Sequence, residues 1–188
     1  MHITLIDNYD SFTYNLVHYL EGFDVELSVM KNDSVDWRIL DLTDAIVLSP
    51  GPGLPHESND LLLVVEKYHF KKPILGVCLG MQALAVYFGE SLENQSEVKH
   101  GVSEVINILN PGVLFEGIER KTIVGLYHSW KINLRENSKF ISTSLSENDV
   151  LMSFEHTSLP LYGVQFHPES IMTLEGKKII QNFVLSIQ

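Results

Sequence analysis

The stretch ILGVCLGMQALAVYF, residues 74–88, carries the strongest fold signal in this chain. Ile74–Val77 is a short apolar run typical of a strand that is buried on both faces, and Leu79–Phe88 has the composition of a helix. Between them, the five residues from Gly76 to Gly80 have the form of a nucleophile elbow, with the sulfur of Cys78 in place of a hydroxyl. We expect a tight, strained turn that the glycines permit. The stretch therefore predicts a strand, a sharp turn at a cysteine and then a helix.

The same alternation of strand and helix extends toward the N-terminus. Apolar runs rich in β-formers occupy Ile3–Asp7, Val25–Met30 and Ala45–Ser49, and helix-like stretches occupy Ser11–Leu20 and Asn59–Tyr68. This rhythm is typical of right-handed βαβ units around a parallel sheet. Fully apolar strands need helices on both faces of the sheet. We therefore predict an α/β fold, a three-layer α/β/α sandwich with a mostly parallel central sheet.

The C-terminal half has a different character. Strand-like runs separated by turn residues occupy Val102–Leu109, Thr122–Tyr127, Lys139–Ser144, Val150–Glu155 and Leu161–Gln165. They predict a small antiparallel β addition to the sheet. The last segment, Leu174–Ile187, has the apolar spacing of an amphipathic helix. Because no linker or repeat interrupts the chain, residues 1–188 are expected to form a single domain.

The composition narrows the classes of function. The net charge of -11, from 24 acidic and 13 basic side chains, argues against a nucleic-acid partner. No apolar run approaches the roughly 18 residues that span a bilayer, so no membrane association is expected. A single cysteine rules out an intrachain disulfide, and the first residues resemble a strand rather than a signal peptide. These features predict a cytoplasmic protein.

Cys78 is the candidate nucleophile. A free thiol has a pKa of about 8.5, but a helix N-terminus and a nearby imidazole both favour the reactive thiolate. The candidate base is His167, because it follows the apolar run Leu161–Phe166 and strand ends carry catalytic groups in open α/β sheets. Pro168 favours an extended backbone at His167, which would bring the carboxylate of Glu169 alongside the ring. Alone, the cysteine would more often be a buried hydrophobe. The tripeptide alone would be an ordinary turn about as often as a catalytic segment, but together the two features favour catalysis.

Two further features suit a site for an amide substrate. The rigid loop Gly51-Pro52-Gly53 can present backbone N–H groups to an oxyanion, together with the N–H of Leu79. Gln82 lies one helical turn after Cys78 on the same face, where its amide can reach a substrate. A plain strand-exit turn and a surface glutamine are the alternatives that these two features leave open.

Five ordered segments resemble the class I, triad-type glutamine amidotransferases, and more narrowly the small glutaminase subunits of anthranilate synthase and aminodeoxychorismate synthase. The segments cover nearly the whole chain and are Asp7–Leu16, Leu48–Gly53, Gly76–Gln82, Tyr127–Ser129 and Gln165–Ser170. Their shared order makes a chance match negligible. The resemblance implies a flavodoxin-like α/β fold, and we expect neither a cofactor nor a metal.

The resemblance also implies roles for single residues. Cys78, His167 and Glu169 would form a triad, and glutamine would be held by the Gly51–Gly53 loop, by Gln82 and by the backbone at Ser129 and Trp130. The thiol would attack the side-chain carbonyl of L-glutamine, and water would hydrolyse the resulting thioester to glutamate. The ammonia would pass to a larger chorismate-binding synthase subunit, which is the expected partner.

Five positions depart from the usual pattern of these subunits, namely Asn59, Met81, Val102, Leu126 and Trp130. None removes a triad atom, but Val102 and Leu126 replace basic residues and would alter contacts with the synthase. Two alternatives stay open, an α/β cysteine hydrolase for other amides and a non-catalytic regulatory subunit. No residue decides between the anthranilate and aminodeoxychorismate pathways.

Overall fold

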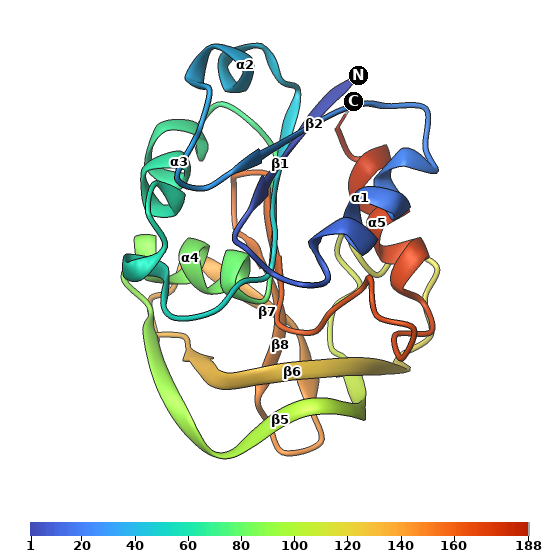
Figure 1. The fold of residues 1–188 in the computed structure, drawn as a ribbon. Helices are drawn as coiled ribbons and strands as arrows, with labels where there is room; N and C mark the ends of the chain where they lie inside the picture. Colours follow the sequence, from blue (N-terminus) through green and yellow to red (C-terminus); the bar gives the residue numbers. More distant parts are fainter. Residues whose placement is uncertain (188) are drawn as a thin grey trace.

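The apolar runs of the N-terminal half form the parallel part of one sheet (Figure 1). The computed structural model describes residues 1–187. The parallel strands stand in the order β2-β1-β3-β4-β9, and their bounds are Glu26–Lys31, His2–Asp7, Ala45–Leu48, Ile74–Val77 and Leu161–Val164. Strands β3, β4 and β9 are buried at every position, whereas the edge strand β2 is partly exposed. Burial on both faces explains why the inner strands are apolar throughout.

The antiparallel strands continue the same sheet from β9. Their order is β9-β8-β7-β5-β6, with bounds Leu151–His156 for β8, Phe140–Ser146 for β7, Ser91–Ile108 for β5 and Lys121–Asn133 for β6. The antiparallel part is larger than the small addition that we expected, because four of the strand pairings are parallel and four are antiparallel. Both β5 and β6 extend beyond the apolar runs of the sequence, since residues such as Asn94 and Trp130 continue the pairing.

Helices cover both faces of the sheet, as Figure 1 shows. One face packs against α1 (Thr13–Glu21) and α5 (Gly176–Leu185), and the other against α2 (Trp37–Leu42), α3 (Leu61–Tyr68) and α4 (Leu79–Tyr87). A short 3-10 turn, Pro55–Glu57, precedes α3. Each face has its own buried apolar cluster, so the three-layer α/β sandwich is confirmed. Within residues 1–187, no helix is both long and apolar enough to cross a membrane.

The helix α2 was not predicted from the sequence. It has six residues, of which only Leu40 is buried, so it is too short to show a helical period. The N-cap residue Asp36 accepts a hydrogen bond from the backbone N–H of Arg38 at 3.0 Å. A local cap therefore starts this helix, where the apolar pattern gives no signal.

The strand order places the segments of the two candidate catalytic residues, Cys78 and His167, side by side. Strands β4 and β9 are parallel neighbours, with Val77 opposite Val164. The backbone N–H of Cys78 donates to the carbonyl of Val164 at 2.8 Å, which extends this pairing by one residue. Residues that follow β4 and β9 therefore meet at the carboxyl edge of the sheet, where open α/β sheets bind their ligands.

Candidate active site

Cys78 is the strained residue of the elbow. Its backbone has φ 51° and ψ −103°, in a region that costs a non-glycine residue about 1–3 kcal/mol. The tight, strained turn that we expected is present, but the strain falls on Cys78, because neither Gly76 nor Gly80 has a positive φ. A Cβ atom on Gly76 would lie 2.5 Å from the carbonyl carbon of Gly80, and one on Gly80 would overlap the backbone of Leu48. The glycines instead let α4 begin in close contact with β3 and β4.

His167 and Glu169 form a buried pair. The Nδ1 atom of His167 lies 2.6 Å from Oε1 of Glu169. The chain turns after His167 instead of continuing extended to Glu169 as we expected, since the N–H of Ser170 donates to the carbonyl of His167 at 3.1 Å. The N–H of His167 donates to the carbonyl of Gly125 on β6 at 3.0 Å, and Thr173 Oγ1 donates to the His167 carbonyl. The antiparallel half of the sheet therefore fixes the position of the histidine.

The ring of His167 is enclosed by aromatic side chains. Its centroid lies 5.9 Å from that of Phe12 and 4.9 Å from that of Tyr127. Burial by itself lowers the pKa of His167, but the Cys78 sulfur and the Glu169 carboxylate outweigh it and hold the pKa well above 6.5. Nε2 has no hydrogen-bond partner among the described residues, so the thiol influences the ring without forming an aligned bond to it. Such catalytic bonds often tighten only when substrate binds.

The sulfur of Cys78 does have a donor, which we did not predict. The side-chain amide of Gln165 donates to Sγ at 3.4 Å, and the amide of Gln82 donates to Oε1 of Gln165 at 3.1 Å. Gln82 is only 3% exposed and is hydrogen-bonded to Gln165, so the alternative of a surface glutamine is wrong. In the sequence, Gln165 ends the strand-like run Leu161–Gln165 and begins the family-like segment Gln165–Ser170, but neither feature indicated a bond to the sulfur.

A cavity of about 190 Å³ opens beside the thiol. Its lining residues are Gly51, Pro52, Gly53, Cys78, Gln82, Tyr127, His128, Ser129 and Trp130. The structure thus gathers all the residues expected to bind substrate except Leu79, which is buried as the first residue of α4. Its N–H has no partner within the helix, as at any helix N-terminus. Tyr127 and His128 line the cavity in addition to the residues that the sequence indicated.

The Pro-Gly loop is held by an asparagine chain. The backbone N–H and side-chain amide of Asn8 donate to Oγ and the carbonyl oxygen of Ser49, each at 2.8 Å. Asn32 donates to Asn8 at 3.0 Å, and Asn59 donates to Asn32 at 2.9 Å. Asn59 has φ 47°, a left-handed conformation that asparagine and glycine share, so this departure from the usual glycine keeps the local backbone.

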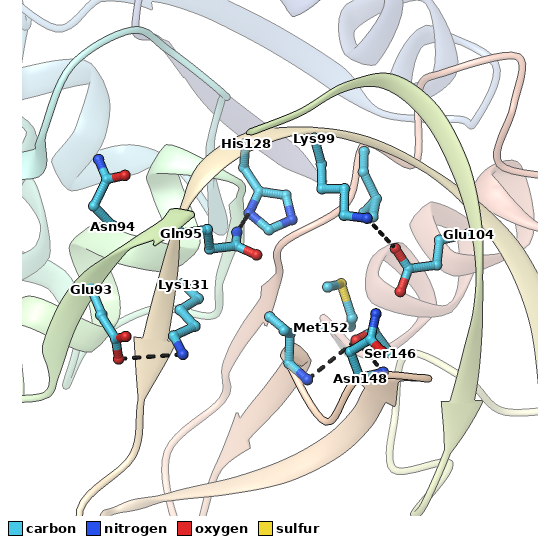
Figure 2. A pocket seen from close by; sticks show the side chains of 12 residues that line it. Glu93, Asn94, Gln95, Lys99, Glu104, His128, Lys131, Ser146, Asn148 and Met152 are labelled. Atoms are coloured by element: carbon cyan, nitrogen blue, oxygen red, sulfur yellow. Dashed lines mark hydrogen bonds and ion pairs between the residues drawn. The ribbon is translucent and has the colours of Figure 1, made fainter. Parts of the chain in front are cut away.

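A second cavity of about 340 Å³ lies between β5, β6 and the turn from β7 to β8, as Figure 2 shows. Two ion pairs line it, Lys99 with Glu104 at 3.7 Å and Lys131 with Glu93 at 3.3 Å. His128 lines both cavities.

His128 supports the backbone of the cavity beside Cys78. Its Nδ1 donates to the carbonyl of Trp130 at 2.9 Å, and burial, with the charges of His167 and Lys99, lowers its pKa. The ring is therefore neutral at pH 7 and holds the backbone at Ser129 and Trp130 in place.

Of the four other departures from the family pattern, Trp130 lines the cavity beside the thiol, whereas Met81, Val102 and Leu126 do not. Met81 is fully buried in the core below Gly163, and Leu126 is a buried wall of the second cavity. Val102 is 39% exposed on β5.

One group of potential metal ligands occurs among residues 1–187. Donor atoms of Asp10, His167 and Glu169 all lie within 4.8 Å of one another. Two of these residues already form the hydrogen bond between Nδ1 and Oε1, so the cluster is explained without an ion.

Comparisons with known proteins show the family of this chain. The family model described as glutamine amidotransferase class-I matches residues 4–187. The aminodeoxychorismate/anthranilate synthase component 2 of Bacillus subtilis is 40% identical over 186 residues, which cover 97% of this chain and 95% of the relative. The anthranilate synthase component 2 of Lactococcus lactis is 38% identical over 185 residues, with 97% and 93% covered.

Two solved structures have the same fold as this chain. A Thermoplasma acidophilum protein assigned to GMP synthase superimposes with a TM-score of 0.89 at 30% identity, covering 100% of this chain and 94% of the other. A Thermotoga maritima glutamine amidotransferase, at 16% identity, shares the fold with a TM-score of 0.78 over 100% of this chain and 97% of the other. With the family match over almost its full length, this chain belongs to the class I glutamine amidotransferases.

Proposed function

We propose that this chain is the glutaminase subunit of a chorismate-using synthase and hydrolyses L-glutamine to glutamate and ammonia. The observation that carries the proposal is the thiol of Cys78, on a strained elbow beside the buried pair of His167 and Glu169, facing a small polar cavity. A nucleophile, a base and an orienting carboxylate are the three parts that covalent amide hydrolysis needs.

The reaction uses each part in turn. His167 takes the thiol proton, and the sulfur attacks the side-chain carbonyl of glutamine, so that a C–S bond forms. His167 then protonates the departing nitrogen, the C–N bond breaks and ammonia leaves a γ-glutamyl thioester. Water gives a proton to His167 and attacks the thioester, the C–S bond breaks and glutamate is released. The proton on His167 then returns to the sulfur and regenerates the thiol. Glu169 stabilises the imidazolium in both halves of the reaction.

Backbone amides are positioned to bind the two oxyanions. Leu79 begins α4, so its N–H is not used inside the helix. The side chain of Leu79 lies directly below Gly51, where a Cβ atom would come within 2.7 Å of its Cδ2. The first residue of α4 and the Pro-Gly loop therefore form one packed unit around the thiol, and one oxyanion donor is typically worth about 3–4 kcal/mol of barrier.

The proposed acceptor of the ammonia is a larger synthase chain that binds chorismate. The support comes from relatives whose names are anthranilate synthase component 2 and aminodeoxychorismate/anthranilate synthase component 2. The aminodeoxychorismate synthase of Streptomyces griseus contains a segment that is 43% identical to this chain and makes up 26% of that protein. The same glutaminase unit therefore occurs both as a separate component and within a longer synthase.

The experiment measures glutamate release and covalent labelling of Cys78 by a glutamine-mimicking diazo ketone, with and without candidate synthase chains. We expect labelling at Cys78, protection by glutamine, and loss of both turnover and labelling in Cys78→Ser. Gln181→Met on α5 is the control and should behave as wild type. Hydrolysis of other amides in preference to glutamine would instead support a general cysteine hydrolase. Binding to a synthase with no turnover and no labelling would support a regulatory role.

A further inference from the structure

Two buried glutamine side chains form a chain that ends on the sulfur of Cys78. Gln165 is 0% exposed, and its Nε2 lies 3.4 Å from Sγ. Its Oε1 accepts a hydrogen bond from Nε2 of Gln82 at 3.1 Å, and Gln82 is 3% exposed. The second bond fixes the orientation of the Gln165 amide, because its carbonyl oxygen is committed to Gln82 and its N–H groups must then face the sulfur.

The backbone around Gln165 is equally well defined. Its N–H donates to the carbonyl of Met152 on β8 at 2.8 Å, and the preceding residue, Val164, accepts the N–H of Cys78. Gln165 is thus the position directly after β9 that adjoins the nucleophile across the parallel pairing of β4 and β9. Gln82 is one helical turn beyond Cys78, and its own N–H donates to the Cys78 carbonyl at 3.0 Å. Both glutamines are anchored to the backbone of the elbow.

We propose that Gln165 is a further catalytic residue, whose side-chain amide supports negative charge on the sulfur of Cys78, and that Gln82 is the positioning residue that aims this amide. The inference deepens the proposed glutaminase function and rests on it for its role in turnover. A hydrogen bond to an ionised acceptor is roughly twice as strong as one to a neutral acceptor. The bond therefore favours the thiolate over the thiol.

The sulfur carries a negative charge at two stages of the reaction. His167 takes the thiol proton and leaves a thiolate, whose electron pair forms the C–S bond, so the sulfur then becomes neutral. When water attacks the thioester, the C–S bond breaks and the electron pair returns to sulfur, which is reprotonated from His167. The Gln165 amide is placed to support the sulfur at both of these stages, and it exchanges no proton itself.

The two glutamines differ in their access to substrate. Gln82 lines the catalytic cavity, whereas Gln165 does not. Loss of the Gln165 amide should therefore lower kcat and leave KM nearly unchanged, while loss of the Gln82 amide should also raise KM. A glutamine that only filled space would show neither this split nor any effect on the ionisation of the thiol.

The test measures the rate of Cys78 alkylation by iodoacetamide from pH 5 to pH 10 in wild type, Gln165→Met, Gln82→Met and the double variant. We expect Gln165→Met to alkylate about tenfold more slowly at pH 6–7 and to reach its maximal rate at a higher pH. Gln82→Met should change in the same direction by less. The double variant should match Gln165→Met, because both substitutions break one chain. The control Gln181→Met, on α5, should give the wild-type profile.

Wild-type alkylation profiles for Gln165→Met and Gln82→Met would overturn the proposal, as would additive effects in the double variant. Thermal unfolding shows whether each variant folds. If Gln165→Met does not fold, the alkylation profile of Gln82→Met decides the outcome alone, because Gln82 lies on the face of α4 that lines the cavity. Alkylation needs no glutamine. An altered alkylation profile without glutamine turnover would therefore refute the glutaminase function and keep the role of Gln165, whereas turnover with an unaltered profile would refute only Gln165.

Discussion

The Nδ1 atom of His167 lies 2.6 Å from Oε1 of Glu169, and the two side chains are 2% and 0% exposed. A carboxylate so deeply buried is costly unless a cation or several donors face it. Its second oxygen, Oε2, has no hydrogen-bond partner in the described part of the chain, so the imidazole is its main support. The pair therefore favours the protonated ring, which is the form that would give a proton to the leaving nitrogen in the proposed reaction.

The first prediction concerns the Glu169 carboxylate. Glu169→Gln keeps the size of the side chain but removes the charge that stabilises the imidazolium. We expect kcat for glutamine hydrolysis to fall by about 10²- to 10⁴-fold with little change in KM, as measured by glutamate release. Glu147→Gln, at an exposed position, is the control. Wild-type turnover in Glu169→Gln would remove this carboxylate from the mechanism.

The second prediction concerns the pH dependence of stability. The pKa of His167 is raised above 6.5 in the folded protein, so the folded state binds a proton that the unfolded state releases. The resulting stabilisation is complete below pH 6.5 and is lost as the pH rises through the raised pKa. We expect the wild-type Tm to fall over this range and the fall to be shallower in Glu169→Gln. Parallel curves from pH 6 to pH 10 in thermal unfolding would contradict this expectation.

The third prediction concerns the packing of the elbow. Gly76→Ala would bring a Cβ atom within 2.5 Å of the backbone of Gly80, and neither rigid segment can move away cheaply. We expect the free energy of unfolding to drop by about 3 kcal/mol in urea titrations. Gly22→Ala, where φ is −71° and the nearest atom is 3.2 Å away, should change it by less than about 1 kcal/mol. Equal effects at the two glycines would refute the packing argument.

The fourth prediction concerns His128. His128→Phe keeps the ring but loses the bond from Nδ1 to the Trp130 carbonyl, which frees the backbone that lines the catalytic cavity. We expect KM for glutamine to rise about tenfold with a smaller change in kcat. His18→Phe, on the exposed face of α1, should leave both constants unchanged. A fall in kcat alone would place His128 in the chemistry rather than in binding.

The amino-acid pattern alone predicts the parallel half of the sheet and the candidate catalytic residues at its edge. Runs such as Ala45–Leu48 and Ile74–Val77 are apolar because both faces of the sheet are covered, and that local signal needs no tertiary information. Cys78 and His167 could likewise be found from their places at strand ends. The short helix Trp37–Leu42 and the polar half of β5 could not, because neither shows an apolar period.

The way these parts meet depends on the tertiary structure. The parallel pairing of β4 with β9 joins segments that lie 87 residues apart at Cys78 and Gln165, and no local pattern specifies which strands are neighbours. The same pairing placed a donor on the sulfur, and the turn at Pro168, rather than an extended chain, brought Glu169 to the ring. Local backbone preferences depend on the residue types and can be predicted from the sequence. The strand order depends on burying both apolar faces of the sheet at once, which only the tertiary structure achieves.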